Sequence, residues 1–257
     1  MCFTHKNFAR VLNQYQYKFN TGDIIAGTVF SEEKNGYLID IGDNNAAYLP
    51  NEEISVVVNN SNDISRYKTH EFFILASNPD SKQLILSLRR LRYIRSWDRI
   101  KQIKQEDIVL GVEVKSLNKG GIIVEVESIR GFVPNSHLAY MIDKEKLIGT
   151  RLKCKLLIAN EHFNQLVLSN RCAVLERMLD SLQIGLAISA PITEIKPYGV
   201  FFNVNNIPAL LHISEIPTRY LNNIRNNFPL NQKKIIKIIH IDIKQGRLSV
   251  TLQKNLS

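Results

Sequence analysis

The chain of 257 residues repeats one pattern three times, with a pitch of roughly 80 residues. Each copy has an apolar opening run, an alternating run that starts on a glycine, a short run rich in apolar residues, and a closing alternating run. These landmarks lie at 21–29, 36–41, 46–50 and 83–87 in the first copy; at 105–112, 121–126, 130–134 and 165–169 in the second; and at 184–192, 199–204, 209–212 and 247–251 in the third. Because the landmarks coincide in all three copies, the chain must consist of three similar modules.

Within each copy, apolar and polar residues alternate over short segments that are separated by glycine and asparagine. This period of two is typical of β-strands between tight turns. About five strands in ~70 residues fit a small closed barrel, which leaves few exposed strand edges. We therefore predict an all-β fold of three tandem five-stranded barrels, at 21–90, 103–170 and 183–257.

Helical spacing of apolar residues replaces the alternation outside these modules. It predicts an N-terminal helix at 1–20, a basic helical linker at 91–102 and a second helical linker at 171–182, and we expect these helices to cap barrel ends. The apolar stripes comprise Phe8, Val11, Leu12, Tyr15 and Phe19; Leu88, Leu91, Ile94, Trp97 or Asp98, Ile100 and Ile103; and Cys172, Leu175, Met178, Leu179 and Leu182.

The net charge of +9 and the isoelectric point near 9.4 indicate a polyanionic partner, either nucleic acid or an anionic membrane surface. No apolar run approaches the ~20 residues that span a bilayer, so the sequence excludes membrane insertion. Charge is distributed unevenly: the net value is −6 over 21–88, +5 over 89–102, +1 over 103–170 and +6 over 183–257. We expect the first module to repel a phosphate backbone and the third to attract it.

Residues for catalysis or metal binding are not arranged in any recognisable pattern. The three cysteines (Cys2, Cys154 and Cys172) form no CxxC pair and are interpreted as thiols of a reducing compartment. The six histidines lack metal-ligand spacing, and there is no phosphate-binding glycine loop. The sequence therefore predicts a protein that is not an enzyme, with no cofactor, no metal and no small-molecule substrate.

Two motifs of the third copy carry a family resemblance. The segment 196–202 (KPYGVFF) and the segment 210–216 (LLHISEI) resemble the S1 RNA-binding domain, a branch of the OB-fold. The whole chain resembles the short, three-repeat S1 ribosomal proteins of cyanobacteria and plastids, with further support from 3–5, 20–24, 72–75 and 130–137. The resemblance implies three S1-type OB barrels in a constituent of the small ribosomal subunit that binds single-stranded mRNA and promotes its capture for translation initiation.

The expected RNA site lies on the third copy. Strand alternation places Tyr198 and Phe201 on the outer surface, with His212 beside them. The resemblance implies that these three side chains stack on bases, that Asp242 and Arg247 complete the patch, and that Lys196 belongs to the same site. The alternative is that Tyr198 and Phe201 are ordinary barrel aromatics without a role in binding. A secondary RNA track is expected along the linker helix at Arg92, Arg95 and Arg99, although an ordinary solvated helix face explains these arginines equally well.

The first two copies carry other residues at the site positions. The third copy's Tyr198, Phe201, His212, Asp242 and Arg247 correspond to Asn35, Leu38, Pro50, Asn78 and Gln83 in the first, and to Gly120, Ile123, Pro134, Asn160 and Gln165 in the second. His137 aligns with Glu215 rather than with His212, and we interpret it as a surface or capping histidine. Neither copy is predicted to be a strong base-stacking site.

The acidic first module is expected to dock on protein components of the small subunit, so that 1–90 attaches to the ribosome and 183–257 captures RNA. Two alternatives stay open: an RNA chaperone or translational regulator that acts without the ribosome, and an accessory RNA-binding subunit of a ribonuclease complex. A composition rich in Asn, Ile and Lys and the lack of a transit-peptide pattern favour the plastid stroma over cyanobacterial cytoplasm.

Overall fold

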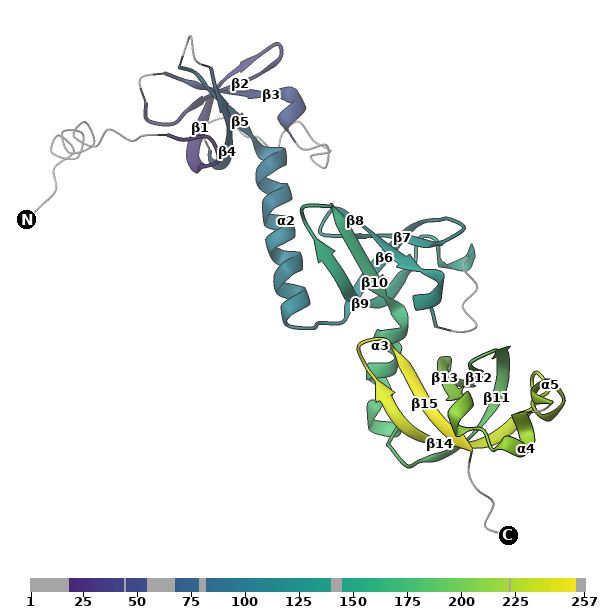
Figure 1. The fold of residues 1–257 in the computed structure, drawn as a ribbon. Helices are drawn as coiled ribbons and strands as arrows, with labels where there is room; N and C mark the ends of the chain where they lie inside the picture. Colours follow the sequence, from purple (N-terminus) through teal and green to yellow (C-terminus); the bar gives the residue numbers. More distant parts are fainter. Residues whose placement is uncertain are drawn as a thin grey trace, which may run out of the picture. The chain divides into compact units, whose positions relative to one another are not determined.

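All three copies form closed five-stranded barrels in the computed structural model of the chain (Figure 1). The structure describes residues 19–43, 45–54, 68–78, 82–139, 145–221 and 223–252. The chain divides into two compact units after residue 95, with one barrel in the first unit and two in the second. The fold is thus all-β with three OB-type barrels, as the sequence predicted. The expected N-terminal helix at 1–20 lies outside the described residues, except for Phe19 and Asn20.

The first barrel has the strand order β1-β2-β3-β5-β4, closed by pairing of β1 with β4. Its elements are β1 (Ile24–Glu33), β2 (Gly36–Asp40), β3 (Ala47–Pro50), the 3-10 turn η1 (Asn51–Glu53), β4 (Thr69–Ser77) and β5 (Leu84–Ser87). All pairs are antiparallel except β3 with β5. Alternate side chains fill the interior, among them Val29, Ile39, Leu49, Phe72 and Leu86.

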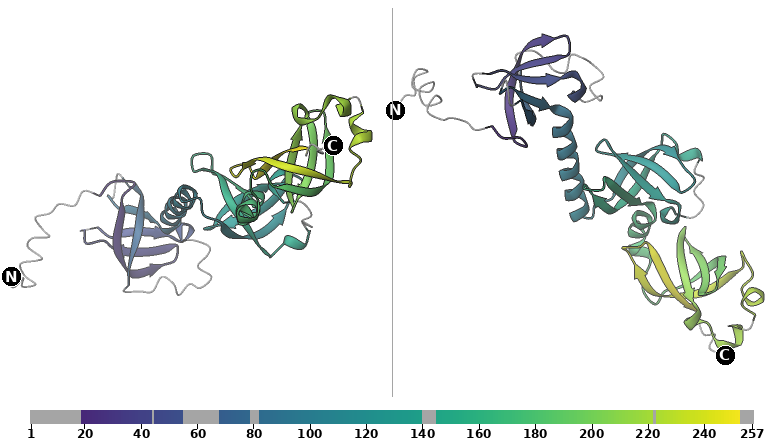
Figure 2. Two further views of the ribbon diagram at one scale, coloured as in Figure 1. Left: turned by 90° about the horizontal axis from the view of Figure 1, so that it is seen from below. Right: turned by 45° about the horizontal axis from the view of Figure 1, so that its top comes forward.

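The second and third barrels repeat this topology, and Figure 2 shows the strands of each barrel from two further directions. The second comprises β6 (Leu110–Leu117), β7 (Gly121–Val126), β8 (Ile129–Pro134), η2 (Asn135–His137), η3 (Glu145–Leu147), β9 (Arg151–Asn160) and β10 (Gln165–Ser169). The third comprises β11 (Ala187–Lys196), β12 (Gly199–Val204), β13 (Ile207–His212), η5 (Ile213–Glu215), α4 (Thr218–Leu221), α5 (Ile224–Asn227), β14 (Lys233–Asp242) and β15 (Arg247–Leu252).

The glycine that starts the second strand of every barrel is required by close packing. A Cβ added at Gly36, Gly121 or Gly199 would lie 2.1–2.4 Å from a backbone oxygen of the neighbouring strand. Any larger residue would force the two strands apart. This contact explains why the same glycine recurs in the three copies.

Helices follow the first two barrels directly. Helix α2 (Leu88–Gln105) follows β5, and the Ser87 hydroxyl accepts a hydrogen bond from the Arg90 backbone N–H at 2.8 Å. On this helix Trp97 is buried and Asp98 is exposed. Trp97, and not Asp98, therefore belongs to the apolar stripe that the sequence predicted. Helix α3 (Asn170–Arg177) follows β10 and is extended by η4 (Leu179–Ser181). No helix in the described parts of the chain is long and apolar enough to cross a membrane.

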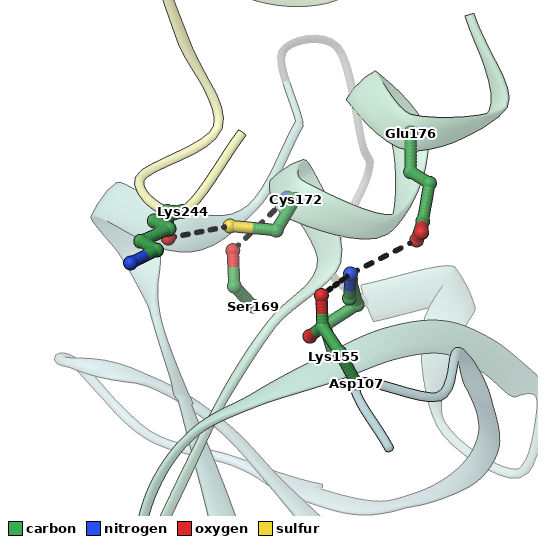
Figure 3. A network of polar contacts seen from close by, with 6 residues as sticks. All are labelled: Asp107, Lys155, Ser169, Cys172, Glu176 and Lys244. Atoms are coloured by element: carbon green, nitrogen blue, oxygen red, sulfur yellow. Dashed lines mark hydrogen bonds and ion pairs between the residues drawn. The ribbon is translucent and has the colours of Figure 1, made fainter. Parts of the chain in front are cut away.

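Helix α3 is fixed by polar contacts at its start and on its side (Figure 3). The Ser169 hydroxyl accepts a hydrogen bond from the Cys172 backbone N–H at 3.1 Å, which caps the helix. The buried Lys155 ammonium lies 2.5 Å from an Asp107 carboxylate oxygen and 3.2 Å from one of Glu176. Leu175 on the same helix belongs to the core of the third barrel. The helix therefore packs on the third barrel while its side is tied to the second.

Candidate RNA-binding surface

The outer face of the third barrel carries a row of side chains that crosses four strands. Phe201 on β12 pairs with Leu210 on β13, which lies beside Ser249 on β15, and Ser249 pairs with His240 on β14. The neighbours of Phe201 along its strand, Val200 and Phe202, are completely buried. Because side chains alternate along a strand, the members of the row point away from the core. Phe201 is the member of this row that belongs to the expected site, and the row runs from Phe201 across the barrel face to His240.

Two aromatic rings lie together at one end of this row. The Tyr198 and Phe201 ring centroids are 6.0 Å apart with an interplanar angle of 86°, an edge-to-face arrangement. Tyr198 is in the turn between β11 and β12 and remains 46% exposed. The Lys196 ammonium lies 5.8 Å from the Phe201 ring centroid and 3.3 Å from the Glu194 carboxylate. The pair thus offers aromatic surface to solvent next to a cation.

His212 lies beside the aromatic pair at the end of β13, opposite Gly199. Its Nδ1 accepts a hydrogen bond from the Ser214 backbone N–H at 3.3 Å and lies 2.8 Å from the Ser214 hydroxyl. The Ile213 backbone N–H donates to the Tyr198 carbonyl oxygen at 3.0 Å, which ties the strand end to the aromatic turn. The imidazole is exposed and its ring is held in position by these contacts.

Asp242 and Arg247 pair across the end of β14 and β15. An Asp242 carboxylate oxygen accepts a hydrogen bond from the Gln245 backbone N–H at 3.0 Å, so this side chain shapes the turn between the two strands. Strands β13 and β15 run parallel, with Leu210 beside Ser249. Arg247 lies two residues before Ser249 on β15, and His212 lies two residues after Leu210 on β13. Arg247 and His212 therefore lie on opposite sides of the Phe201 row, and the patch extends across the barrel face.

The row also contains a residue that the sequence did not indicate. Ile236 and Ile238 are buried, so strict alternation would turn His240 inward as well. A β-bulge between Ile238 and His240 shifts the alternation, and His240 is exposed on the same row as Phe201. Simple alternation could not have found this residue, because the bulge has no sequence signal of its own.

The comparison with known proteins decides the family. The chain is 47% identical over 253 residues to the small ribosomal subunit protein bS1c of Pyropia yezoensis, an alignment that covers 98% of this chain and 96% of that protein. This chain belongs to the bS1 family. A family member from Synechococcus sp., named small ribosomal subunit protein bS1, is 40% identical over 98% of this chain and 83% of its own length. The bS1c protein of Spinacia oleracea is 32% identical over 98% of this chain and 62% of its own length. The model of the S1 RNA binding domain matches residues 103–171, which hold the second barrel.

The strand registers relate the three barrels of this bS1 chain residue by residue. Pro50 pairs with Gly36 and Pro134 with Gly121, as His212 pairs with Gly199. Asn160 pairs with Gln165 as Asp242 pairs with Arg247. These pairs give the same equivalences as the sequence repeats. The first two barrels thus carry proline where the third has its exposed histidine.

His137 of the second barrel is half-buried at the end of η2. Its Nδ1 lies 3.1 Å from the Ser169 hydroxyl. Burial of the ring, and then the nearby guanidinium groups of Arg171 and Arg247, lower the pKa of His137 from its ordinary value of 6.5. This residue therefore lies close to Arg247 of the third barrel, a proximity that the sequence did not reveal.

The arginines of the expected secondary track are all on α2. Arg92 and Arg99 are exposed, and the guanidinium of Arg95 forms an ion pair with Glu71 of the first barrel. A contact with Glu71 offsets part of the positive charge that Arg95 would present to a phosphate. Arg92 and Arg99 are the stronger candidates for this track.

The two cysteines that the structure describes are poorly suited to act as nucleophiles. Cys154 and Cys172 are both buried and reduced. Burial raises the pKa of the Cys154 thiol to about 12, and burial also raises that of Cys172. Since the thiolate is the nucleophilic form, neither thiol is activated. No group of three or more potential metal ligands occurs among the residues that the structure describes.

Proposed function

We propose that this bS1 family member is a constituent of the small ribosomal subunit that binds single-stranded mRNA and promotes its capture for translation initiation. The observation that carries the proposal is the edge-to-face pair of exposed Tyr198 and half-buried Phe201 on the outer face, with His212 beside it, on a module of net charge +6. The names of the bS1 relatives support the assignment to the small subunit.

The chemistry of this patch suits unpaired RNA. Every base presents a π-face, and stacking on an aromatic side chain contributes about 1–3 kcal/mol per base with little sequence selectivity. In our proposal Tyr198, Phe201 and His212 stack on bases. Lys196 and Arg247 attract phosphates, and Asp242 holds the turn that presents Arg247. Arg92 and Arg99 extend the path of the RNA along α2.

We further propose a division of labour between the modules. The first barrel region, 21–88, has a net charge of −6, which disfavours a phosphate backbone and suits a basic protein partner. Residues 1–90 would attach the chain to proteins of the small subunit, while 183–257 would hold the mRNA. The chain would act by binding and not by catalysis, without a cofactor.

We place the protein in a plastid stroma, in association with ribosomes, or else in cyanobacterial cytoplasm. The relatives named bS1c and the chain's bias toward Asn, Ile and Lys both support the plastid.

The test is a pelleting assay with salt-washed small subunits and a labelled single-stranded RNA. The full chain should pellet with the subunits and increase the RNA in the pellet. A Phe201→Ala/His212→Ala double variant should still pellet but carry less RNA. A chain that binds RNA but stays in the supernatant would instead be an RNA chaperone or regulator that acts without the ribosome.

A further inference from the structure

The turn between β14 and β15, residues 243–246, packs directly on the start of helix α3. Gly246 adopts a φ of +63°, and a Cβ at this position would lie 3.0 Å from the Cys172 backbone nitrogen and 3.1 Å from the Arg171 carbonyl carbon. Bare glycine backbone therefore allows the turn to approach the helix this closely. Arg247, a cation of the proposed RNA site, is the next residue in the chain.

Two adjacent residues at the start of α3 bind two adjacent carbonyl oxygens of this turn. The Arg171 guanidinium donates to the Gln245 carbonyl oxygen at 2.6 Å. The Cys172 thiol donates to the Lys244 carbonyl oxygen, with 3.4 Å between sulfur and oxygen (Figure 3). Burial raises the pKa of Cys172, so the thiol keeps the proton that it donates. The turn is therefore held to the helix at two consecutive points.

The contact made by Arg171 is connected to the RNA site through the backbone of Gln245. The Gln245 N–H donates to an Asp242 carboxylate oxygen at 3.0 Å, and Asp242 pairs with Arg247 across the two strands. The carbonyl oxygen of Gln245 is the one that accepts from Arg171. A change at Arg171 would therefore alter the turn whose ends carry Asp242 and Arg247.

The second barrel holds the other end of this contact. The second terminal nitrogen of Arg171 donates to the Ser136 carbonyl oxygen of η2 at 2.6 Å. A guanidinium is a planar fork of donors, so one side chain can bind two backbone acceptors at a set separation, whereas a lysine ammonium is a single point charge. Arg171 is 5% exposed, so packing determines its direction.

The corresponding arginine of the first barrel is not buried. Arg89 follows Ser87 by two residues, as Arg171 follows Ser169, and each serine hydroxyl accepts a backbone N–H from the residue three positions further on. Arg89 lies 3.2 Å from a Glu53 carboxylate oxygen of η1, but its side chain is 64% exposed. The arginine position is thus buried where the turn of the third barrel packs on the helix.

We propose that Arg171 is a positioning residue for the RNA site of the third barrel: it fixes the β14–β15 turn so that Arg247 is directed at the phosphate that it binds. This inference rests on the proposed RNA-binding function. A turn released from the helix would let Arg247 sample more positions, and RNA binding would have to order them at a cost in affinity. Through Arg171, the second barrel would influence the RNA affinity of the third without contact between Arg171 and RNA.

The experiment is a double-mutant cycle on the full chain with a labelled oligouridylate of roughly 10 nucleotides, within the site size of one OB barrel. Arg247→Gln should weaken binding about 10-fold, the effect of losing one hydrogen bond to a charged group. It should also reduce the slope of log affinity against log salt by about 0.7. Arg171→Gln should weaken binding roughly 2- to 10-fold, because Arg247 is then less well placed. It should have almost no effect when Arg247 is already replaced, because it acts through that residue.

Two further variants separate positioning from charge and from stability. Arg171→Lys keeps the charge but not the fork, and should bind RNA more weakly than the wild type. Gly246→Ala places a Cβ against the start of α3 and should displace the turn while Arg171 is intact, with the same loss of roughly 2- to 10-fold. The matched control is Gly149→Ala, since Gly149 has a similar φ of +76° but nothing within 4 Å of an added Cβ, and it should leave the affinity unchanged. Circular dichroism at the assay temperature checks that each variant is folded.

The proposed function and the positioning role fail in different ways. If the wild-type chain binds no RNA, the proposed function fails. If Arg247→Gln weakens binding but Arg171→Gln and Gly246→Ala bind like the wild type, only the positioning role is overturned. It is also overturned if Arg171→Gln causes the same loss with and without Arg247, because the loss would then come from general destabilisation. Full affinity in Arg171→Lys would show that charge alone suffices, and full affinity in Arg247→Gln would leave Arg171 with no residue to position; either result overturns the positioning role.

Discussion

The Arg171 guanidinium donates a hydrogen bond to the Gln245 carbonyl oxygen at 2.6 Å, and its other terminal nitrogen donates to the Ser136 carbonyl oxygen at 2.6 Å. Arg171 is only 5% exposed at the start of α3. Ser136 belongs to η2 of the second barrel, and Gln245 to the β14–β15 turn of the third. One buried side chain therefore links the second barrel to the turn whose ends carry Asp242 and Arg247.

Loss of this link should destabilise the unit formed by 96–257. Arg171→Gln would leave two carbonyl oxygens without their charged donor and should lower the free energy of unfolding by about 3 kcal/mol. Arg177→Gln, an exposed change on the same helix, should stay within about 0.5 kcal/mol of the wild type. Urea denaturation of the full chain measures both. Equal transition midpoints for the two variants would contradict this role for Arg171.

The lowered pKa of His137 makes stability depend on pH in a defined window. The unfolded chain takes up a proton on this residue near the ordinary value of 6.5, whereas the folded chain resists protonation because of burial, Arg171 and Arg247. Stability should therefore fall as the pH drops below 6.5, until the folded-state pKa is passed. Arg247→Gln removes one of the causes and should raise the pKa of His137. An NMR titration of the His137 ring in both proteins measures this, and identical titration curves would disprove the proximity.

Much of the fold was predictable because the repeats specify the same strands three times. The glycines Gly36, Gly121 and Gly199 and the outward direction of Phe201 follow from alternation and close packing. Other features depend on tertiary contacts. The bulge before His240 reverses its direction, and Arg171 reaches residues far along the chain.

Lys155 should stabilise the contact between the second barrel and α3. Burial alone lowers the pKa of its ammonium, but hydrogen bonds to Asp107 and Glu176 outweigh burial and raise the pKa above 10.5. The stabilisation should be present below pH 10.5 and lost as the pH rises through the raised value. Lys155→Met should cost about 1 kcal/mol, because both carboxylates lose their partner but Asp107 and part of Glu176 stay in contact with water. Lys153→Met, an exposed change on the same strand, should have little effect in thermal unfolding. Similar melting temperatures for the two variants would refute the argument.

Close packing at the second strand can be tested with a pair of glycines in the second barrel. A Cβ at Gly121 would lie 2.1 Å from the Val133 carbonyl oxygen, whereas a Cβ at Gly111 would meet nothing within 4 Å. Gly121→Ala should destabilise by about 3 kcal/mol, because backbone cannot move aside without separating β7 from β8. Gly111→Ala should be nearly neutral. Chemical denaturation of the two variants measures the difference, and a neutral Gly121→Ala would show that the strands can adjust.

The most direct test of the central claim is the affinity of the full chain for a labelled single-stranded RNA, compared among the wild type, Phe201→Ala, His212→Ala and Leu38→Ala. Phe201 and His212 face outward, so their loss should leave the fold intact and weaken binding by roughly 1–3 kcal/mol each. Leu38 is the residue of the first barrel equivalent to Phe201, and its replacement should leave RNA affinity nearly unchanged. Unchanged affinity in Phe201→Ala and His212→Ala, or an equal loss in Leu38→Ala, would contradict the assignment of RNA capture to the third barrel.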